Sequence, residues 1–347
     1  MEINQLVRKN IAAMEAYSSA RDEFKNFDKE MIFLDANENP FDNGINRYPD
    51  PQQKKLKHQL SVLKNIPESQ ILLGNGSDEV LDLLIRAFCE PNRDNVITLP
   101  PTYGMYGVLA NLNAVENREV ILLDSFQPDI DKILEVIDNN TKIIFICSPN
   151  NPTGNLIEED KTITLLENFN GLIVLDEAYI DFSDAESWIL KLENYKQLVV
   201  TQTLSKAYGM AGIRLGILYA SEEIIDVLNK IKPPYNVNAL TQLEAIKRLN
   251  KNQVAKDEIV SIKREKEILS KQLLEVKFIE KVYPSNANFI LIKVDNATKR
   301  YNQLLANGFV IRNRSSQPLC QNCLRITVGN EEENKQLIKT LKTIQNG

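Results

Sequence analysis

Three stretches of this sequence decide the fold, and each is an apolar run that ends in polar residues. They are KIIFICSPNNPTG (residues 142–154), LIVLDEAY (172–179) and LVVTQTLSK (198–206). Each apolar run is short and rich in β-branched residues, which is typical of a buried strand. The carboxyl ends of parallel strands share the edge of a sheet where ligands bind. We therefore expect the polar residues after the three runs to form one site.

Amphipathic helical patterns between such runs predict an α/β architecture. Residues 80–88 and 130–137 carry apolar side chains at helical spacing. After residue 235 come a long charged helical segment, strand-like runs at 288–293 and 308–312, and a final amphipathic helix. The sequence thus predicts a large domain with a mostly parallel central sheet flanked by helices, and a smaller α+β domain.

The predicted domain boundaries follow the change near residue 235 from alternating strands and helices to a long charged helix. We expect residues 1–35 to form an N-terminal arm that contributes to the small domain and the active site. Residues 36–235 are predicted to form the large domain, and residues 236–347 the small C-terminal domain.

The composition excludes several classes of function. The 347 residues carry 41 Lys and Arg against 47 Asp and Glu, a formal charge of −6, which gives no electrostatic basis for binding nucleic acid. The single histidine, His58, cannot build a multi-histidine metal site, and it fits best as a surface helix residue. Proton transfers would therefore depend on Lys, Tyr, Asp or a cofactor. We expect a cytoplasmic protein without a membrane contact, because neither a signal peptide nor a membrane-spanning apolar run is present.

The four cysteines suggest a reduced protein. Cys320 and Cys323 have the CxxC spacing, but no second pair completes a zinc site and no thioredoxin-like context surrounds them. We interpret them as small core residues, and we expect no metal.

The polar residues at the strand ends match the requirements of pyridoxal 5′-phosphate (PLP). This cofactor needs a lysine for a Schiff base, a carboxylate at the pyridine nitrogen, donors to the phenolate oxygen and a phosphate site. Lys206 and Asp176 are candidates for the first two roles, and Tyr179 and Asn151 for the third. Arg214 is a candidate donor to a phosphate oxygen.

The segment GNGSDE (residues 74–79) opens a predicted helix, and glycines followed by helix N-terminal amides can bind phosphate. It lacks the Gly-Lys-Ser/Thr of a P-loop. Each of these residues could also have a role that involves no cofactor. Lys206 could be a surface lysine, Asp176 and Ser77 could be helix caps, and Asn151 could belong to a plain turn. Their order along three consecutive strand ends favours the single-site hypothesis.

These motifs together resemble the fold type I PLP-dependent aminotransferases. The resemblance rests on SPNNPTG (148–154), DEAY (176–179), and Ser205-Lys206 with Arg214 eight positions later. Further segments resemble the histidinol-phosphate aminotransferase family in particular, and the resemblance spans nearly the whole chain. These segments are LVR (6–8) with YSSAR (17–21), LDANENP (34–40), RYPD (47–50), LIRAFC (84–89), PPTYGMY (100–106) and LRITVG (324–329).

The resemblance implies a role for each matching residue. Lys206 would hold the cofactor and move the substrate proton, Asp176 would pair with the pyridinium nitrogen, and Tyr103 would stack on the ring. Asn151 and Tyr179 would bond the phenolate oxygen. The cofactor phosphate would be held by Ser77, Asp78, Thr203, Ser205 and Arg214, and by Tyr48 from the neighbouring subunit of a homodimer. Substrate contacts would be made by Tyr17, Asn37, Arg312 and Arg325.

One ambiguity concerns two arginines. Arg312 and Arg314 lie two apart in a strand-like segment and hence on one face of a regular strand. The family spacing to Arg325 favours Arg312, but a bulge could turn Arg314 inward, and either could be a solvent-exposed basic residue.

The implied activity is transfer of the amino group of L-histidinol phosphate to 2-oxoglutarate, in histidine biosynthesis. The products would be imidazole-acetol phosphate and L-glutamate, by a ping-pong mechanism. Alternatives on the same fold are an aromatic amino acid aminotransferase and threonine-phosphate decarboxylase, which is a lyase. A non-enzymatic cofactor-binding regulator is disfavoured by the acidic charge and by the lack of a DNA-binding segment before the site.

Overall fold

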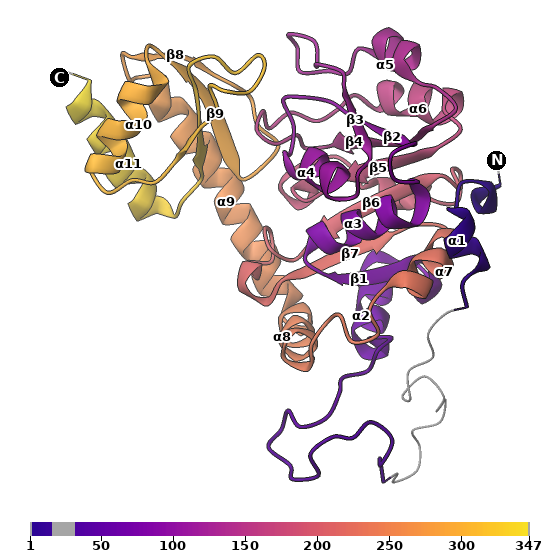
Figure 1. The fold of residues 1–347 in the computed structure, drawn as a ribbon. Coiled ribbons are helices and arrows are strands. Elements are labelled where there is room, and N and C mark those ends of the chain that lie inside the picture. Colours follow the sequence, from indigo (N-terminus) through magenta and orange to yellow (C-terminus); the bar gives the residue numbers. More distant parts are fainter. Residues whose placement is uncertain (1, 16–31, 346–347) are drawn as a thin grey trace.

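The computed structural model describes residues 2–15 and 32–345 (Figure 1). The helices are α1 (Lys9–Ala13), α2 (Lys54–Lys64), α3 (Ser77–Phe88), α4 (Met105–Leu112), α5 (Ile130–Val136), α6 (Glu159–Asn168), α7 (Glu222–Ile231), α8 (Ala239–Asn250), α9 (Asn252–Leu273), α10 (Ala297–Ala306) and α11 (Glu331–Ile344). The strands are β1 (Ile71–Asn75), β2 (Asn95–Thr98), β3 (Glu116–Glu119), β4 (Thr141–Cys147), β5 (Leu172–Asp176), β6 (Leu198–Thr203), β7 (Leu215–Tyr219), β8 (Ile279–Val282), β9 (Phe289–Val294), β10 (Arg312–Asn313) and β11 (Cys323–Thr327).

A seven-stranded sheet forms the centre of the larger part of the molecule, in the order β1-β7-β6-β5-β4-β2-β3. Neighbouring strands are parallel in the β6-β5-β4-β2-β3 part of the sheet. β7 runs antiparallel to both of its neighbours, β6 and β1. In this register Cys147 lies beside Asp176, and Asp176 lies beside Thr201. The polar residues that follow β4, β5 and β6 therefore meet at one edge, and the predicted α/β fold with a mostly parallel sheet is confirmed.

Helices cover both faces of this sheet, as its side chains require. Along β4, Ile144 and Ile146 face one buried cluster, while Ile143 and Phe145 face another. The first cluster includes residues of α2 and α6, and the second includes residues of α3, α4 and α7. Because alternate residues of a strand point to opposite faces, a strand buried on both sides has a continuous apolar sequence.

The smaller part contains a four-stranded antiparallel sheet in the order β10-β11-β9-β8. Ile290, Ile292 and Leu324 on one face pack into a cluster with residues of α9, α10 and α11. Phe289 and Leu291, on the other face, join a core cluster of the larger part. This second face of the small sheet therefore looks toward the large sheet, and α9 connects the two parts (Figure 1).

One predicted strand is wrong in most of its length. Residues 308–312 read as a strand, yet β10 contains only Arg312 and Asn313, which pair with Arg325 and Leu324. Gly308 adopts a φ of 86° just after α10, so the chain is still turning there. The apolar pattern of 308–311 instead reflects burial: Ile311 packs in the same cluster as α10.

The two sheets lie in separate parts of the chain, since β7 ends at Tyr219 and β8 begins at Ile279. The division into residues 1–35, 36–235 and 236–347 remains our proposal. Within the described ranges, no helix is long and apolar enough to cross a membrane. No group of three or more His, Cys, Asp or Glu within the same ranges could hold a metal ion.

Candidate active site

A cavity of about 110 Å³ opens at the carboxyl ends of β4, β5 and β6. The residues that line it come from the three strand ends, from the start of α3 and from the segment before β7. They are Ser77, Asp78, Tyr103, Cys147, Asn151, Asp176, Ala178, Tyr179, Thr203, Ser205, Lys206, Ala211 and Arg214. The structure thus brings together all the cofactor residues that were proposed to come from the same chain. Tyr48, which was proposed to come from the neighbouring subunit, does not line this cavity.

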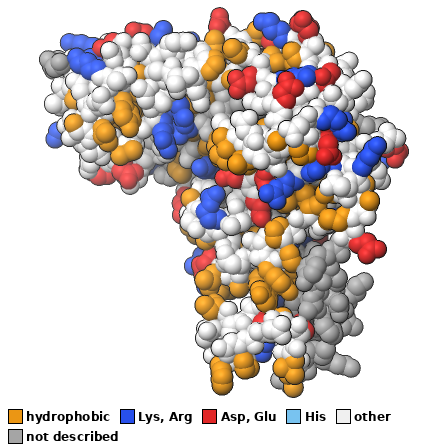
Figure 2. All heavy atoms as spheres, in the orientation of Figure 1, with side chains coloured by type: hydrophobic (Ala, Val, Ile, Leu, Met, Phe, Trp, Pro, Cys, Tyr) orange, Lys and Arg blue, Asp and Glu red, His pale blue; other side chains and the backbone are white. Residues whose placement is uncertain are grey.

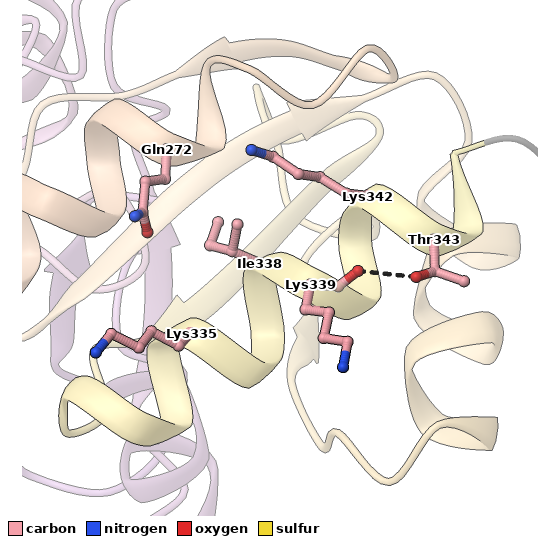
Figure 3. Close-up of a pocket in the computed structure, with 6 residues that line it drawn as sticks. All are labelled: Gln272, Lys335, Ile338, Lys339, Lys342 and Thr343. Atoms are coloured by element: carbon pink, nitrogen blue, oxygen red, sulfur yellow. Dashed lines mark hydrogen bonds between the residues drawn. The ribbon is translucent and has the colours of Figure 1, made fainter.

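A larger hollow of about 610 Å³ lies elsewhere, between α9 and α11, and contains none of the predicted site residues (Figure 3). Three lysines of α11 line it. Lys335 and Lys342 form ion pairs with Glu331 and Glu275. Surface pairs of this kind leave little uncompensated charge, so this hollow has no chemistry comparable with the first cavity.

Lys206 presents its amine to the cavity just beyond β6. Its Nζ lies 5.9 Å from the centroid of the Tyr179 ring. Lys206 is exposed to solvent, but partial burial of its amine lowers the pKa of Lys206, and the positive charge of Arg325 lowers it further. A lysine with a lowered pKa is more often neutral near pH 7, as a nucleophile or a proton acceptor must be.

Asp176 is a buried carboxylate at the floor of the cavity. Its Oδ1 accepts a hydrogen bond from the backbone N–H of Ala178 at 3.1 Å, and its Oδ2 accepts one from the hydroxyl of Tyr106 at 2.7 Å. Burial raises the pKa of Asp176, while the hydrogen bond from Tyr106 opposes this rise. A cationic partner, such as a protonated ring nitrogen, would compensate the buried negative charge.

Tyr106 is a site residue that the sequence analysis did not single out. It is fully buried, and its ring stacks on Phe145 with a centroid distance of 4.9 Å. It also contacts Tyr103, edge to face, at 5.5 Å. The signal was the second tyrosine of PPTYGMY: Tyr103 lies just before α4 and Tyr106 is the second residue of that helix.

Asn151, Tyr179 and Arg325 form a second group at the cavity. The Asn151 amide nitrogen donates to the Tyr179 hydroxyl at 3.5 Å, and Arg325 donates to the Asn151 side-chain oxygen. Burial raises the pKa of Tyr179, so its hydroxyl stays protonated and can donate a hydrogen bond. Arg325 comes from β11 of the small sheet, so this group joins the two parts of the molecule.

The opposite end of the cavity has the features of a phosphate site. The N-cap residue of α3 is Gly76, with φ 83°, and Ser77 and Asp78, the first two residues of the helix, line the cavity. The free N–H groups and the positive dipole end of a helix N-terminus favour an anion. Arg214 adopts φ 55° and approaches so closely that a Cβ on Gly76 would lie 2.6 Å from its Nη2. The hydroxyls of Thr203 and Ser205 lie 3.0 Å apart beside it.

This donor set fits a phosphorylated pyridine aldehyde. An amine, a buried carboxylate, neutral donors and a cationic phosphate cradle occur in one cavity, and the cradle depends on a glycine where a side chain would fill the space. The chemistry of PLP requires these four kinds of group.

Three arginines lie on the face of the small sheet that looks toward this cavity. Arg312 is directly opposite Arg325 in the β10–β11 register, so their side chains share a face. Arg314, two residues on, donates its backbone N–H to the carbonyl of Cys323 and continues the pairing. The register of β10 covers Arg312 and Asn313 alone, so which of Arg312 and Arg314 contacts the substrate stays a prediction.

Other predicted residues lie apart from the cavity. Asn37 and Tyr48 are exposed on the segment before α2, which extends from the lower end of the molecule, and they line a different hollow. Tyr48 stacks on Tyr235 with a centroid distance of 4.4 Å. Tyr17 lies outside the described residues. His58 is exposed on α2 and contacts Glu68, as a surface helix residue should.

Comparisons with known proteins identify the family of the chain. The profile of the family described as aminotransferase class I and II matches residues 30–341. The chain belongs to this family of aminotransferases.

More specific relatives share its full length. The histidinol-phosphate aminotransferase of Flavobacterium johnsoniae is 65% identical over 344 residues, which cover 99% of each chain. The crystal structure of the histidinol-phosphate aminotransferase from Clostridium acetobutylicum has a TM-score of 0.80 and 27% identity, covering 87% of this chain and 91% of that one. The structure of the Sinorhizobium meliloti histidinol-phosphate aminotransferase in complex with pyridoxal-5′-phosphate has the same fold, with a TM-score of 0.80, 22% identity and coverage of 86% and 83%.

Proposed function

We infer that this chain is a PLP-dependent histidinol-phosphate aminotransferase. It transfers the amino group of L-histidinol phosphate to 2-oxoglutarate, and it acts in histidine biosynthesis. The observation that carries this conclusion is the single cavity that holds Lys206, Asp176 and the phosphate cradle with Arg214. The 65% identity to the Flavobacterium johnsoniae enzyme over nearly the whole chain supports the choice of substrate.

The cofactor, when bound, supplies an electron-withdrawing ring that stabilises negative charge at the substrate Cα. The protein supplies the proton transfers and the orientation. Lys206 Nζ would hold the cofactor and then, once released, take the proton from the substrate Cα. Asp176 would accept a hydrogen bond from the protonated ring nitrogen and keep that proton in place. Asn151 and Tyr179 would donate to the phenolate oxygen, and Tyr103 would cover one face of the ring.

We propose the remaining contacts from the resemblance to the family. The backbone N–H groups of Ser77 and Asp78, the hydroxyls of Thr203 and Ser205, and Arg214 would hold the cofactor phosphate. Arg325 would grip the carboxylate of glutamate through its planar fork, and Arg312 would contact the phosphate of the amino donor. Tyr17 and Asn37 would complete the substrate contacts.

We propose that the working unit is a homodimer, in which Tyr48 reaches the cofactor phosphate of the neighbouring subunit. Apolar side chains gather at the lower end of the molecule (Figure 2), where several are exposed to solvent in one copy of the chain. They include Ile32, Leu34, Phe41, Ile45, Leu240 and Leu243. An exposed apolar patch of this kind usually marks an interface. Sedimentation equilibrium of the PLP-loaded protein tests the proposal, and a monomer at micromolar concentration would contradict it. A cytoplasmic location is also proposed, in keeping with four free cysteines.

The activity is tested by titrating L-histidinol phosphate into the PLP-loaded protein without a keto acid. The visible absorption of the bound cofactor should shift completely to that of pyridoxamine phosphate, and added 2-oxoglutarate should restore it. If the absorption changed with aromatic amino acids and not with L-histidinol phosphate, the enzyme would be an aromatic amino acid aminotransferase. Release of carbon dioxide from threonine phosphate would change the reaction class to a lyase.

Tyr106→Phe should slow the amino-donor half-reaction about 10-fold, a value that corresponds to loss of one hydrogen bond to a charged group. The variant keeps the ring on Phe145 but removes the hydroxyl that donates to Asp176. Since that hydrogen bond lowers the pKa of Asp176, its loss raises this pKa and weakens the negative charge at the cavity floor. Rapid-scanning spectroscopy of a single turnover measures the effect, and an unchanged rate would show that Tyr106 serves packing alone.

A further inference from the structure

Lys206 lies in the segment between β6 and β7, residues 204–214, which we call the lysine loop. Apart from one short 3₁₀ helix, this loop has no regular secondary structure. The N–H of Gly209 donates to the carbonyl of Lys206 at 3.1 Å, and the N–H of Met210 donates to the carbonyl of Leu204 at 3.0 Å. A proton acceptor must be held at a defined distance from the reacting atom, so contacts from outside the loop are needed to fix the amine.

Helix α8 holds the lysine loop from outside at two points. The Nε of Arg248 donates to the carbonyl of Tyr208 at 2.9 Å, and the hydroxyl of Thr241 donates to the carbonyl of Ile213 at 2.8 Å. Thr241, Ala245 and Arg248 have the spacing of one helix face. Ala245 is fully buried in the core cluster that also contains Tyr208. One face of α8 therefore packs on the lysine loop and anchors two of its carbonyls.

The guanidinium of Arg248 is itself held from its other end. Its two terminal nitrogens donate to the two carboxylate oxygens of Glu258. Glu258 lies on α9, beyond the junction of α8 and α9, so this ion pair joins the two helices. The side chain of Arg248 is only 19% exposed, which reduces the screening of the pair by solvent. A planar fork that grips a carboxylate leaves Nε with a fixed direction, and a charged donor makes a stronger hydrogen bond than a neutral one.

We propose that Arg248 is a positioning residue for Lys206, which it acts on by holding the carbonyl of Tyr208 and thereby the turn from which the lysine amine reaches the cavity. This inference rests on the proposed role of Lys206 and extends it. Arg248 does not line the cavity, so its effect on the reaction passes through the lysine loop. Without its hydrogen bond the turn moves more, and the amine spends less time within reach of the substrate proton. The loss therefore falls on the rate of proton transfer rather than on substrate binding.

The first measurement is amide hydrogen exchange of the PLP-loaded protein, which needs no substrate. Arg248→Met removes every donor of the side chain but keeps its unbranched stem. The two N–H groups that close the turns of the lysine loop should then exchange about 10-fold faster, as expected for loss of one charged hydrogen bond. Arg118→Met is the matched control, because Arg118 is also half-buried, pairs with Glu116 and donates to the carbonyl of Val136, but does not line the cavity. It should leave exchange in the lysine loop unchanged.

The second measurement is the half-reaction of the PLP-loaded enzyme with L-histidinol phosphate. Arg248→Met should lower the maximal rate about 10-fold, a fraction of the whole contribution of a positioned proton acceptor. The substrate concentration at half-maximal rate should change little. Arg248→Lys keeps a charged donor but loses the planar fork, so it should recover part of the lost rate. Arg118→Met should retain the wild-type rate.

Three results would overturn the proposal. One is exchange in the lysine loop of Arg248→Met equal to that of the wild type. Another is faster exchange with an unchanged maximal rate, because Arg248 would then stabilise the loop without positioning the amine. The third is a loss that appears only in the substrate concentration at half-maximal rate.

Thermal melting of the loaded variants identifies any general loss of the fold. If Arg248→Met does not fold, Glu258→Gln takes its place, because it removes the charge that holds the guanidinium and alters an exposed side chain. It should show faster exchange in the lysine loop and a lower maximal rate, and wild-type values of both would contradict the proposal.

A failure of the proposed function remains distinguishable. If the wild type does not respond to L-histidinol phosphate, the proposed substrate is wrong, whereas hydrogen exchange still tests whether Arg248 holds the lysine loop. Borohydride reduction of the PLP-loaded wild type, followed by peptide mapping, shows which lysine carries the cofactor. Attachment to a lysine other than Lys206 would overturn both the proposed role of Lys206 and that of Arg248.

Discussion

Replacing Lys206 with alanine should abolish transamination, with a loss of more than about 10³-fold in the half-reaction rate. The lysine lies in the cavity with a pKa lowered by burial and by Arg325, so its amine is suited to hold the cofactor and to take the proton from the substrate Cα. No other lysine among the described residues lines this cavity. Lys206→Arg should be equally inactive, because a guanidinium keeps its proton.

Single-turnover absorbance with L-histidinol phosphate measures this loss. The phosphate cradle and Asp176 remain in the alanine variant, so PLP should still bind, but it should be removed faster by dialysis. Lys266→Ala is the matched control: burial lowers the pKa of Lys266 too, but its amine donates to the carbonyl of Ala287 and does not line the cavity. Full turnover by Lys206→Ala, or an equal loss in Lys266→Ala, would contradict the assignment.

Asp176→Asn should reduce the half-reaction rate by about 10²- to 10⁴-fold. Asparagine preserves the size of the side chain, and its single oxygen can still accept one of the two hydrogen bonds, from Tyr106 or from the backbone N–H of Ala178. It lacks the negative charge that keeps a proton on the ring nitrogen, so the cofactor should withdraw electrons less well. Because the structure around the site is kept, the loss should appear in the maximal rate more than in substrate affinity.

The neighbouring carboxylate provides the control for this substitution. Glu177 is also buried, and burial raises its pKa to about 6, but it accepts hydrogen bonds from Ser187, Trp188 and Gln202 and does not line the cavity. Glu177→Gln should therefore retain most of the activity. The visible spectrum of Asp176→Asn must show bound PLP, so that slow turnover is not mistaken for a missing cofactor. A rate within about 3-fold of wild type, far smaller than the loss of a buried charge implies, would exclude a role for the charge.

Much of the cavity could be predicted because its residues follow strands that the sequence marks clearly. Residues 143–147, 172–175 and 198–201 are apolar enough to be buried on both faces, and they lie in β4, β5 and β6. Parallel pairing then brings Asn151, Asp176 and Lys206 to one edge. This inference needs only local patterns and a general property of parallel sheets.

Other features depend on contacts between segments far apart in the chain. Tyr106 and Asp176 are 70 positions apart, and only the packing of α4 on the sheet brings the hydroxyl to the carboxylate. The run at 308–312 has the pattern of a strand, but Arg312 is its one residue in the pairing register of β10 with β11. The spacing of apolar residues predicts which side chains are buried. It does not predict which strand lies close enough to form backbone hydrogen bonds.

The sequence by itself determined the α/β class, the order of the chemical groups and the family to which they belong. The tertiary structure decided that Arg314 is half-buried beside Tyr179 while Arg312 is exposed. The two arginines have the same chemistry and lie two positions apart, so no local pattern distinguishes them. Their difference depends on tertiary contacts, because Tyr179 belongs to a segment more than 130 positions away in the chain.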